Sequence, residues 1–183
     1  MEELAAPTLL ITGIMASGKS TVAQRLAERL DRSVHLRGDI FRRMIVRGRV
    51  DMEPSPSDEA LAQLRLRYQL AAHTAQQYCA MGFAVVYQDV IVGPALGEVI
   101  ALHQAYPLYV VVLCPSPEVA LQRDATRHKQ AYGDWTPKAL DHELRTNIPR
   151  VGLWVDNSAQ TVEETVEAIL ARLSDARVAG SVP

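Results

Sequence analysis

The sequence is short of cysteine and lacks a recognisable metal-binding or redox pattern. Its 183 residues include two cysteines, Cys79 and Cys114, which lie in separate apolar stretches without C-x-x-C spacing. This arrangement argues against a disulfide or a shared metal and predicts two buried thiols.

The sequence also has no excess of one charge and no long apolar run. Its 19 basic and 21 acidic residues give a formal net charge of -2. A nucleic-acid or anionic-membrane partner would therefore need a local basic cluster. The opening stretch MEELAAPTLLITG carries acidic residues where a signal peptide carries basic ones, and its apolar run is too short to cross a bilayer. We expect a cytoplasmic protein with no membrane partner.

Short apolar runs alternate with longer amphipathic stretches, and no internal repeat is present. This alternation predicts an α/β fold: a three-layer sandwich with a five-stranded parallel sheet, buried on both faces and covered by helices on each. We expect one domain over residues 1–175 and a flexible tail over 176–183. The predicted strands are 8–13, 34–38, 83–89, 107–114 and 151–156.

Helix boundaries are marked by capping residues. Hydroxyl residues precede a proline or form a capping box, and one long helix ends at a glycine. These signals are Ser116 before Pro117, Thr136 before Pro137, Thr161 with Glu164, and Gly82 after a helix over about 58–81. The segment 48–58 is rich in turn-forming residues and predicts a surface loop.

The stretch GIMASGKST, Gly13 to Thr21, matches the Walker A phosphate-binding pattern between a predicted strand and a predicted helix. Its glycines let backbone N–H groups converge on phosphate oxygens at a helix N-terminus. Lys19 can reach the β and γ phosphates, and the Ser20 hydroxyl can ligate Mg²⁺. We therefore expect ATP and Mg²⁺ as cofactors, bound by Gly13, Ala16, Ser17, Gly18, Lys19, Ser20 and Thr21.

Asp39 follows the second predicted strand, at the carboxyl edge of the sheet where ligands bind in such folds. It can accept a proton from an attacking hydroxyl or contact the metal's water; the alternative is a helix N-cap. Arg42, three residues on, can position an acceptor, or it is a solvated surface arginine. Asp89 follows the third strand in a Walker B pattern and predicts a Mg²⁺ or acceptor contact, against a turn-forming aspartate as the alternative.

Two arginines and an asparagine complete the predicted site. Arg123 and Arg127 are four residues apart on one helix face, within a predicted lid over about 123–136. They can neutralise charge that develops on the phosphates, or form an exposed basic face. Asn157, in the loop after the last strand, is a candidate adenine contact.

Together these pieces resemble the P-loop small-molecule kinases, in particular the chloramphenicol phosphotransferase-like and zeta-toxin-like AAA family ATP-binding phosphotransferases. The resemblance rests on ASGKS (16–20), Asp39, QDVIVG (88–93), the two lid arginines and VDNS (155–158). It implies that Asp39 deprotonates an acceptor hydroxyl and that ATP with Mg²⁺ supplies the phosphoryl group. The sequence departs from the chloramphenicol enzyme over about 40–65, where the acceptor site is expected and Arg42, Arg43, Arg47, Arg49, Arg65 and Arg67 gather in and beside the segment.

Three hypotheses follow. The first is an ATP-dependent phosphotransferase that acts on a hydroxyl of a small molecule, with Lys19, Asp39, Arg123 and Arg127 as its catalytic residues. The second keeps this chemistry but makes the acceptor a nucleotide or a polynucleotide 5′-hydroxyl, because DIFR (39–42) also resembles the Asp-x-x-Arg of polynucleotide 5′-kinases. The third is a switch that binds ATP without transferring phosphate. Acceptor identity, ATP or GTP preference, oligomeric state and the choice of Asp39 or Asp89 as base stay open.

Overall fold

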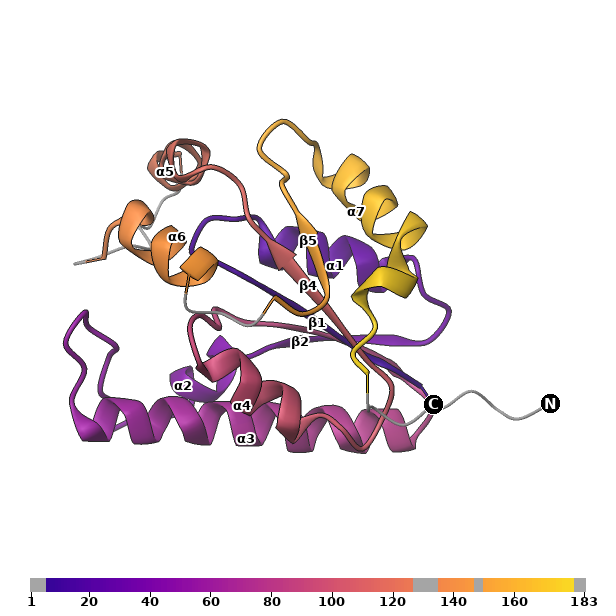
Figure 1. Cartoon of the computed structure of the whole chain (residues 1–183). Coiled ribbons are helices and arrows are strands. Elements are labelled where there is room, and N and C mark those ends of the chain that lie inside the picture. The colour runs from indigo at the N-terminus through magenta and orange to yellow at the C-terminus, as the bar shows by residue number, and fades with distance from the viewer. Residues whose placement is uncertain (1–5, 127–134, 147–149, 180–183) are drawn as a thin grey trace.

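A parallel sheet of five strands forms the centre of the protein (Figure 1). The computed structural model describes residues 6–126, 135–146 and 150–179. The strand order is β2-β3-β1-β4-β5. The strands are β1 (Thr8–Gly13), β2 (Ser33–Arg37), β3 (Ala84–Gln88), β4 (Leu108–Leu113) and β5 (Leu153–Val155). The predicted α/β fold with a five-stranded parallel sheet is confirmed.

The strands differ in burial according to their place in the sheet. All six residues of β1 are buried, because β1 lies in the middle between β3 and β4. In β2, at one edge of the sheet, Leu36 is the one fully buried residue. The expectation that every strand is buried on both faces is therefore wrong for β2, which pairs with β3 alone.

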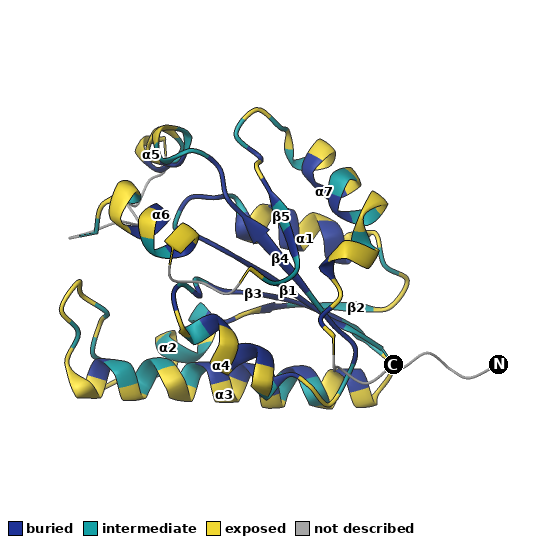
Figure 2. Ribbon diagram, viewed as in Figure 1, coloured by how far each residue is buried: buried dark blue, intermediate teal, exposed yellow. Residues whose placement is uncertain are grey.

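Helices cover both faces of the sheet in three layers (Figures 1 and 2). Alternate residues of β1 point into two separate cores: Leu9 and Ile11 into one, Leu10 into the other. The first core is completed by α1 and α7, and the second by α3, α4, α5 and α6. The helices are α1 (Lys19–Glu28), α2 (Asp39–Arg43), α3 (Asp58–Ala80), α4 (Ala95–Leu102), α5 (Pro117–Ala125), α6 (Pro137–Thr146) and α7 (Val162–Ala171).

The predicted caps lie at the helix ends. The Ser116 hydroxyl accepts a hydrogen bond from the Val119 amide, and Thr161 with Glu164 forms a complete capping box. The long helix α3 ends one residue earlier than predicted, ahead of Gly82. These local signals fix where each helix begins, and so which loops stand at the carboxyl edge of the sheet.

The C-terminal segment is packed further than predicted. A short 3₁₀ helix, η1 (Leu173–Ala176), is followed by Arg177, which bridges to Tyr109 of β4. The Val178 amide donates to the Leu108 carbonyl over 2.9 Å, and Ala176 is fully buried. The predicted flexible tail over 176–183 is thus wrong for residues 176–178, since apolar side chains there close the end of the sheet; 180–183 lie outside the described residues.

Both cysteines are buried free thiols, as predicted. Within the described residues, no helix is both long and apolar enough to span a membrane.

Candidate active site at the carboxyl edge of the sheet

The predicted phosphate loop forms a tight turn between β1 and α1. Gly13 has a φ of 147°, and a Cβ there would lie 2.3 Å from the Leu113 carbonyl oxygen of β4, so no other residue fits without backbone movement. Ala16 adopts a left-handed φ of 57°, which is uncommon for alanine and typical of strained functional turns. Gly18 precedes α1, and no side chain caps the helix, so the first backbone N–H groups of α1 remain for an anion.

Lys19 lies over this loop. Its Nζ donates to the carbonyl oxygens of Gly13 at 3.0 Å and Ile14 at 2.6 Å, and to the Ser17 hydroxyl at 3.4 Å. The side chain is buried, with 7% of its surface exposed. An ammonium group held by neutral carbonyls gains much more from an anion, so these contacts keep Lys19 extended and ready to exchange them for phosphate oxygens.

A cavity of about 290 Å³ opens beside the loop, between the start of α1 and the start of α7. The Asn157 side chain, 3% exposed, donates from Nδ2 to the Ser17 carbonyl at 3.0 Å. Its buried Oδ1 has no hydrogen-bond partner among the described residues, which is costly unless a ligand supplies a donor. The cavity is lined by Ala16, Gly18, Thr21, Val22, Arg123, Asn157, Gln160, Thr161, Val162 and Thr165.

Arg123 lies at this cavity and not in an open lid. One guanidinium nitrogen donates to the Asn157 carbonyl at 2.7 Å, and another donates to the Ser17 carbonyl at 3.4 Å. These contacts tie α5 to both walls of the cavity. Arg127 and most of the predicted lid (127–134) lie outside the described residues.

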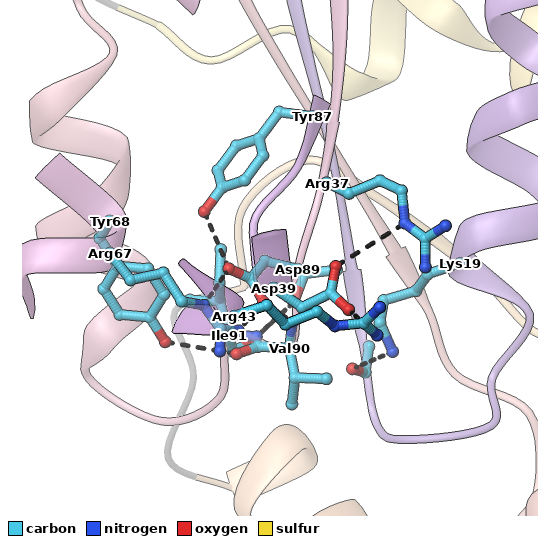
Figure 3. A network of polar contacts seen from close by, with 12 residues as sticks. Lys19, Arg37, Asp39, Arg43, Arg67, Tyr68, Tyr87, Asp89, Val90 and Ile91 are labelled. Atoms are coloured by element: carbon cyan, nitrogen blue, oxygen red, sulfur yellow. Dashed lines mark hydrogen bonds and ion pairs between the residues drawn. The ribbon is translucent and has the colours of Figure 1, made fainter. Parts of the chain in front are cut away.

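Asp39 is the first residue of α2 and lies between two arginines (Figure 3). The Arg43 Nη2 is 2.5 Å from one carboxylate oxygen, and the Arg37 Nε is 3.7 Å from the other. Gly38 occupies the N-cap position, and no side chain caps α2, so the alternative role of Asp39 as an N-cap is wrong. With 32% of its side chain exposed, the carboxylate is accessible and paired only with exposed arginines.

Asp89 is held by the protein on every side. Arg67, from α3, binds it in a bidentate ion pair, with Nε 2.7 Å from Oδ2 and Nη2 on Oδ1. The Tyr87 hydroxyl donates to Oδ2 at 3.2 Å, and the Val90 amide donates to Oδ1 at 2.7 Å (Figure 3). Burial lowers the pKa of the Arg67 guanidinium, and the surrounding tyrosines and Asp39 act against this. Both carboxylate oxygens of Asp89, the predicted metal contact, therefore accept hydrogen bonds from protein groups in this arrangement.

The Asp89 carboxylate also packs against the backbone that leads into α2. A Cβ on Gly38 would lie 1.9 Å from Asp89 Oδ2, so this close approach requires glycine. The Gly38 amide in turn donates to the Gln88 carbonyl at 3.0 Å. The ends of β2 and β3 are thus locked together one residue before Asp39.

This ion pair gives a testable prediction for Asp89. We expect Asp89→Asn and Arg67→Met each to lower the free energy of unfolding by about 3 to 5 kcal/mol, because each leaves a buried charge unpaired. The double variant should lose much less than the sum of the two. Denaturant unfolding measures both effects, and calorimetry should find nearly unchanged affinity for a Mg²⁺-bound ATP analogue in Asp89→Asn. A stable Asp89→Asn variant that no longer binds the Mg²⁺-nucleotide would contradict this and restore Asp89 as a metal ligand.

Comparison with known proteins agrees with the fold. The model of a family described as AAA domain matches residues 9–149, which is most of the chain. The chain belongs to this AAA-domain family. No protein with a curated description matches it.

Several solved kinases share the fold of this AAA-domain protein. The APS kinase CysC of Mycobacterium tuberculosis, solved with AMPPNP and APS, has a TM-score of 0.70 at 17% identity and covers 93% of this chain and 99% of its own. A Janibacter sugar kinase has a TM-score of 0.69 at 17% identity, covering 93% and 96%. A Sinorhizobium meliloti gluconokinase has a TM-score of 0.63 at 21% identity, covering 93% of both chains. At these identities the likeness establishes a P-loop kinase fold.

Sequence reasoning missed some site residues of this AAA-domain protein. Arg67 was grouped with the other arginines, but nothing in the sequence pairs it with Asp89, because the two are 22 residues apart on different elements. Gly38 precedes Asp39 directly, and a glycine between a strand and an aspartate is a signal that can be recognised. Among the cavity residues at the start of α7, Thr161 belongs to the capping box, but that motif marks the start of a helix and not a nucleotide site.

The position of Arg123 leads to a second prediction. We expect Arg123→Ala to weaken binding of a non-hydrolysable ATP analogue by about tenfold, or roughly 1.4 kcal/mol, and to change kcat less, because its contacts shape the nucleotide cavity. The matched control is Arg172→Ala, an exposed arginine paired with Asp175 far from the loop. Calorimetry and turnover measured on both variants separate the effects. A large kcat loss at unchanged affinity would instead support the lid role that the sequence suggests.

Proposed function

We propose that this protein is an ATP-dependent phosphotransferase that moves the γ-phosphoryl group to a hydroxyl of a small molecule. The observation that carries the proposal is the placement of Asp39, an accessible carboxylate, at the same sheet edge as the phosphate loop and Lys19 (Figure 3). The kinases that share the fold act, by their names, on APS, a sugar and gluconate. Their similarity supports a kinase function, whereas the acceptor has to be inferred from this chain's own residues.

The nucleotide site fits ATP. Asn157 Oδ1 is a buried acceptor without a described partner, and the exocyclic amine of adenine is a donor that would satisfy it. The first backbone N–H groups of α1 and the Lys19 ammonium would bind the phosphates. The exposed Ser20 hydroxyl, in the first turn of α1, would hold Mg²⁺ together with phosphate oxygens and water. When bound, Mg²⁺ neutralises charge on the phosphates.

The residues of the chain divide the chemistry between them. Lys19 holds the transferred phosphoryl group and stabilises the negative charge on it. Asp39 takes the proton of the acceptor hydroxyl as that hydroxyl oxygen attacks the γ-phosphorus, the bond from this phosphorus to the β,γ-bridging oxygen breaks, and ADP leaves. The Arg67–Asp89 pair fixes Gly38, and with it the start of α2, so that Asp39 is presented to the acceptor. We assign the base to Asp39 because Asp89 is buried and fully engaged.

The experiment that tests this function is a screen for ATP consumption with small alcohols, sugars and sugar acids. We expect at least one of them to stimulate ADP release far above the rate with water alone. A polynucleotide 5′-end is the second candidate acceptor, because several arginines surround Asp39. A polynucleotide acceptor would show a steep dependence of KM on salt, whereas a small acceptor would show a shallow one.

A further inference from the structure

The ion pairs around Asp39 join more arginines than carboxylates, although the chain as a whole is slightly acidic. Five arginines share three carboxylates there: Arg37 and Arg43 on Asp39, Arg42 and Arg49 on Asp51, and Arg67 on Asp89. Each of Asp39 and Asp51 is therefore paired twice. Arg65, by contrast, lies on the exposed side of α3 with Glu98 as its partner and is not part of this group.

Two of these arginines line one small hollow of about 20 Å³ between α2 and α3, which has room for little more than a water molecule. Arg42 and Arg67 meet there with Gln63 and with the apolar side chains of Val50, Met52 and Leu64. Arg67 has 13% of its side chain exposed, and the positive charge of Arg42 adds to the burial that lowers its pKa. Its third nitrogen, Nη1, has no hydrogen bond among the described residues. Two like charges facing one half-buried hollow are stabilised when an anion lies between them.

The exposed carboxylate of Asp51 supplies one such negative charge. Asp51 binds Arg42, yet 60% of its side chain is exposed and it belongs to the loop before α3. The loop is held by Gln63, which accepts from the Val50 amide and donates to the Gly48 carbonyl. An anionic group that reaches both Arg42 and the Nη1 of Arg67 can displace this exposed carboxylate, because hydrogen bonds between two charged groups are the stronger kind.

We propose that the acceptor carries an anionic group, a carboxylate, phosphate or sulfate, and that Arg42 and Arg67 bind it while Asp51 gives way. This inference rests on the proposed function, because Asp39 must face the hydroxyl of the same acceptor. A small acid or monoester fits this description, and a neutral alcohol does not.

Sulfate is the probe for the anion site, and its binding does not depend on catalysis. In a Lys19→Ala background, which removes the main charge of the phosphate loop, sulfate at constant ionic strength should raise Tm by about 2 °C or more. Adding Arg42→Gln should remove this shift, and adding Arg65→Gln, the matched control, should leave it. Adding Asp51→Asn should enlarge the shift at low sulfate, because the competing carboxylate is gone.

The anion site is overturned if sulfate does not raise Tm, or if it raises Tm equally with and without Arg42.

A second experiment compares acceptors in matched pairs, each a polyol with its acid or monophosphate. We expect turnover only with the anionic members, and KM for them to rise about 10- to 100-fold in Arg42→Gln with a smaller change in kcat. Equal turnover of the neutral members overturns the inference. A steep dependence of KM on salt assigns the anion to a polynucleotide. A sulfate site in a protein that shows no turnover with any acceptor contradicts the proposed function instead.

Discussion

Replacing Lys19 with alanine should abolish phosphoryl transfer and weaken nucleotide binding. Its ammonium group is held 2.6 Å from the Ile14 carbonyl at the centre of the phosphate loop, and Lys138, on α6, is the one other lysine among the described residues. Losing one preorganised donor at a site of developing charge costs about 10² to 10³ in rate, and a full positive charge costs more. ADP release and calorimetry with a non-hydrolysable analogue measure the two losses.

The fold should survive this change. The Lys19 ammonium donates to two loop carbonyls and one hydroxyl, and Lys19 is not one of the apolar residues that form the two cores of the described structure. The control is Lys138→Ala, which removes an exposed lysine on α6. If Lys19→Ala consumes ATP at the rate of the unchanged protein, with the acceptor present, the phosphate loop has been assigned wrongly.

Asp39→Asn should lower kcat by about 10² to 10⁴, the usual cost of removing a general base. Asparagine keeps the shape of the side chain but cannot take the hydroxyl proton. Binding of an ATP analogue should remain nearly unchanged, because the ion pairs of Asp39 within the described residues are with Arg37 and Arg43. The loss of two partly exposed ion pairs should cost little stability.

The outcomes of this variant test the role of Asp39. Asp175→Asn, which removes an exposed carboxylate paired with Arg172, is the control. Undiminished turnover in Asp39→Asn would move the base to Asp89. A collapse of Mg²⁺-nucleotide binding would place Asp39 in the metal shell. A protein that binds nucleotide and never transfers phosphate to any acceptor would be a switch.

The phosphate loop could be predicted because everything it needs is local. A strand, two glycines at fixed spacing and Lys19 at the start of a helix define its geometry within nine residues. The position of Asp39 after β2 could be predicted for a different reason. In a parallel sheet all strands end at the same edge, so any residue just after a strand lies there.

What could not be predicted depends on contacts between distant elements. The Walker B pattern predicts a Mg²⁺ or acceptor contact for Asp89, and only the packing of α3 brings Arg67 onto it. Likewise, helix periodicity put Arg123 on a face of α5 but could not say that this face turns toward Asn157. The partial exposure of β2 and the packing of Val178 depend on strand order, which the sequence leaves open.

The central claim is that the γ-phosphoryl group passes from ATP to a hydroxyl of a small acceptor with Asp39 as base. The most direct test supplies ATP with an isotopically labelled γ-phosphoryl group and follows the acceptor by mass spectrometry, using the unchanged protein and Asp39→Asn. The account predicts a labelled phosphoester that forms with the unchanged protein and at least about 10²-fold more slowly with Asp39→Asn. Label that appears only in free phosphate, or an ester formed equally fast by both proteins, would contradict it.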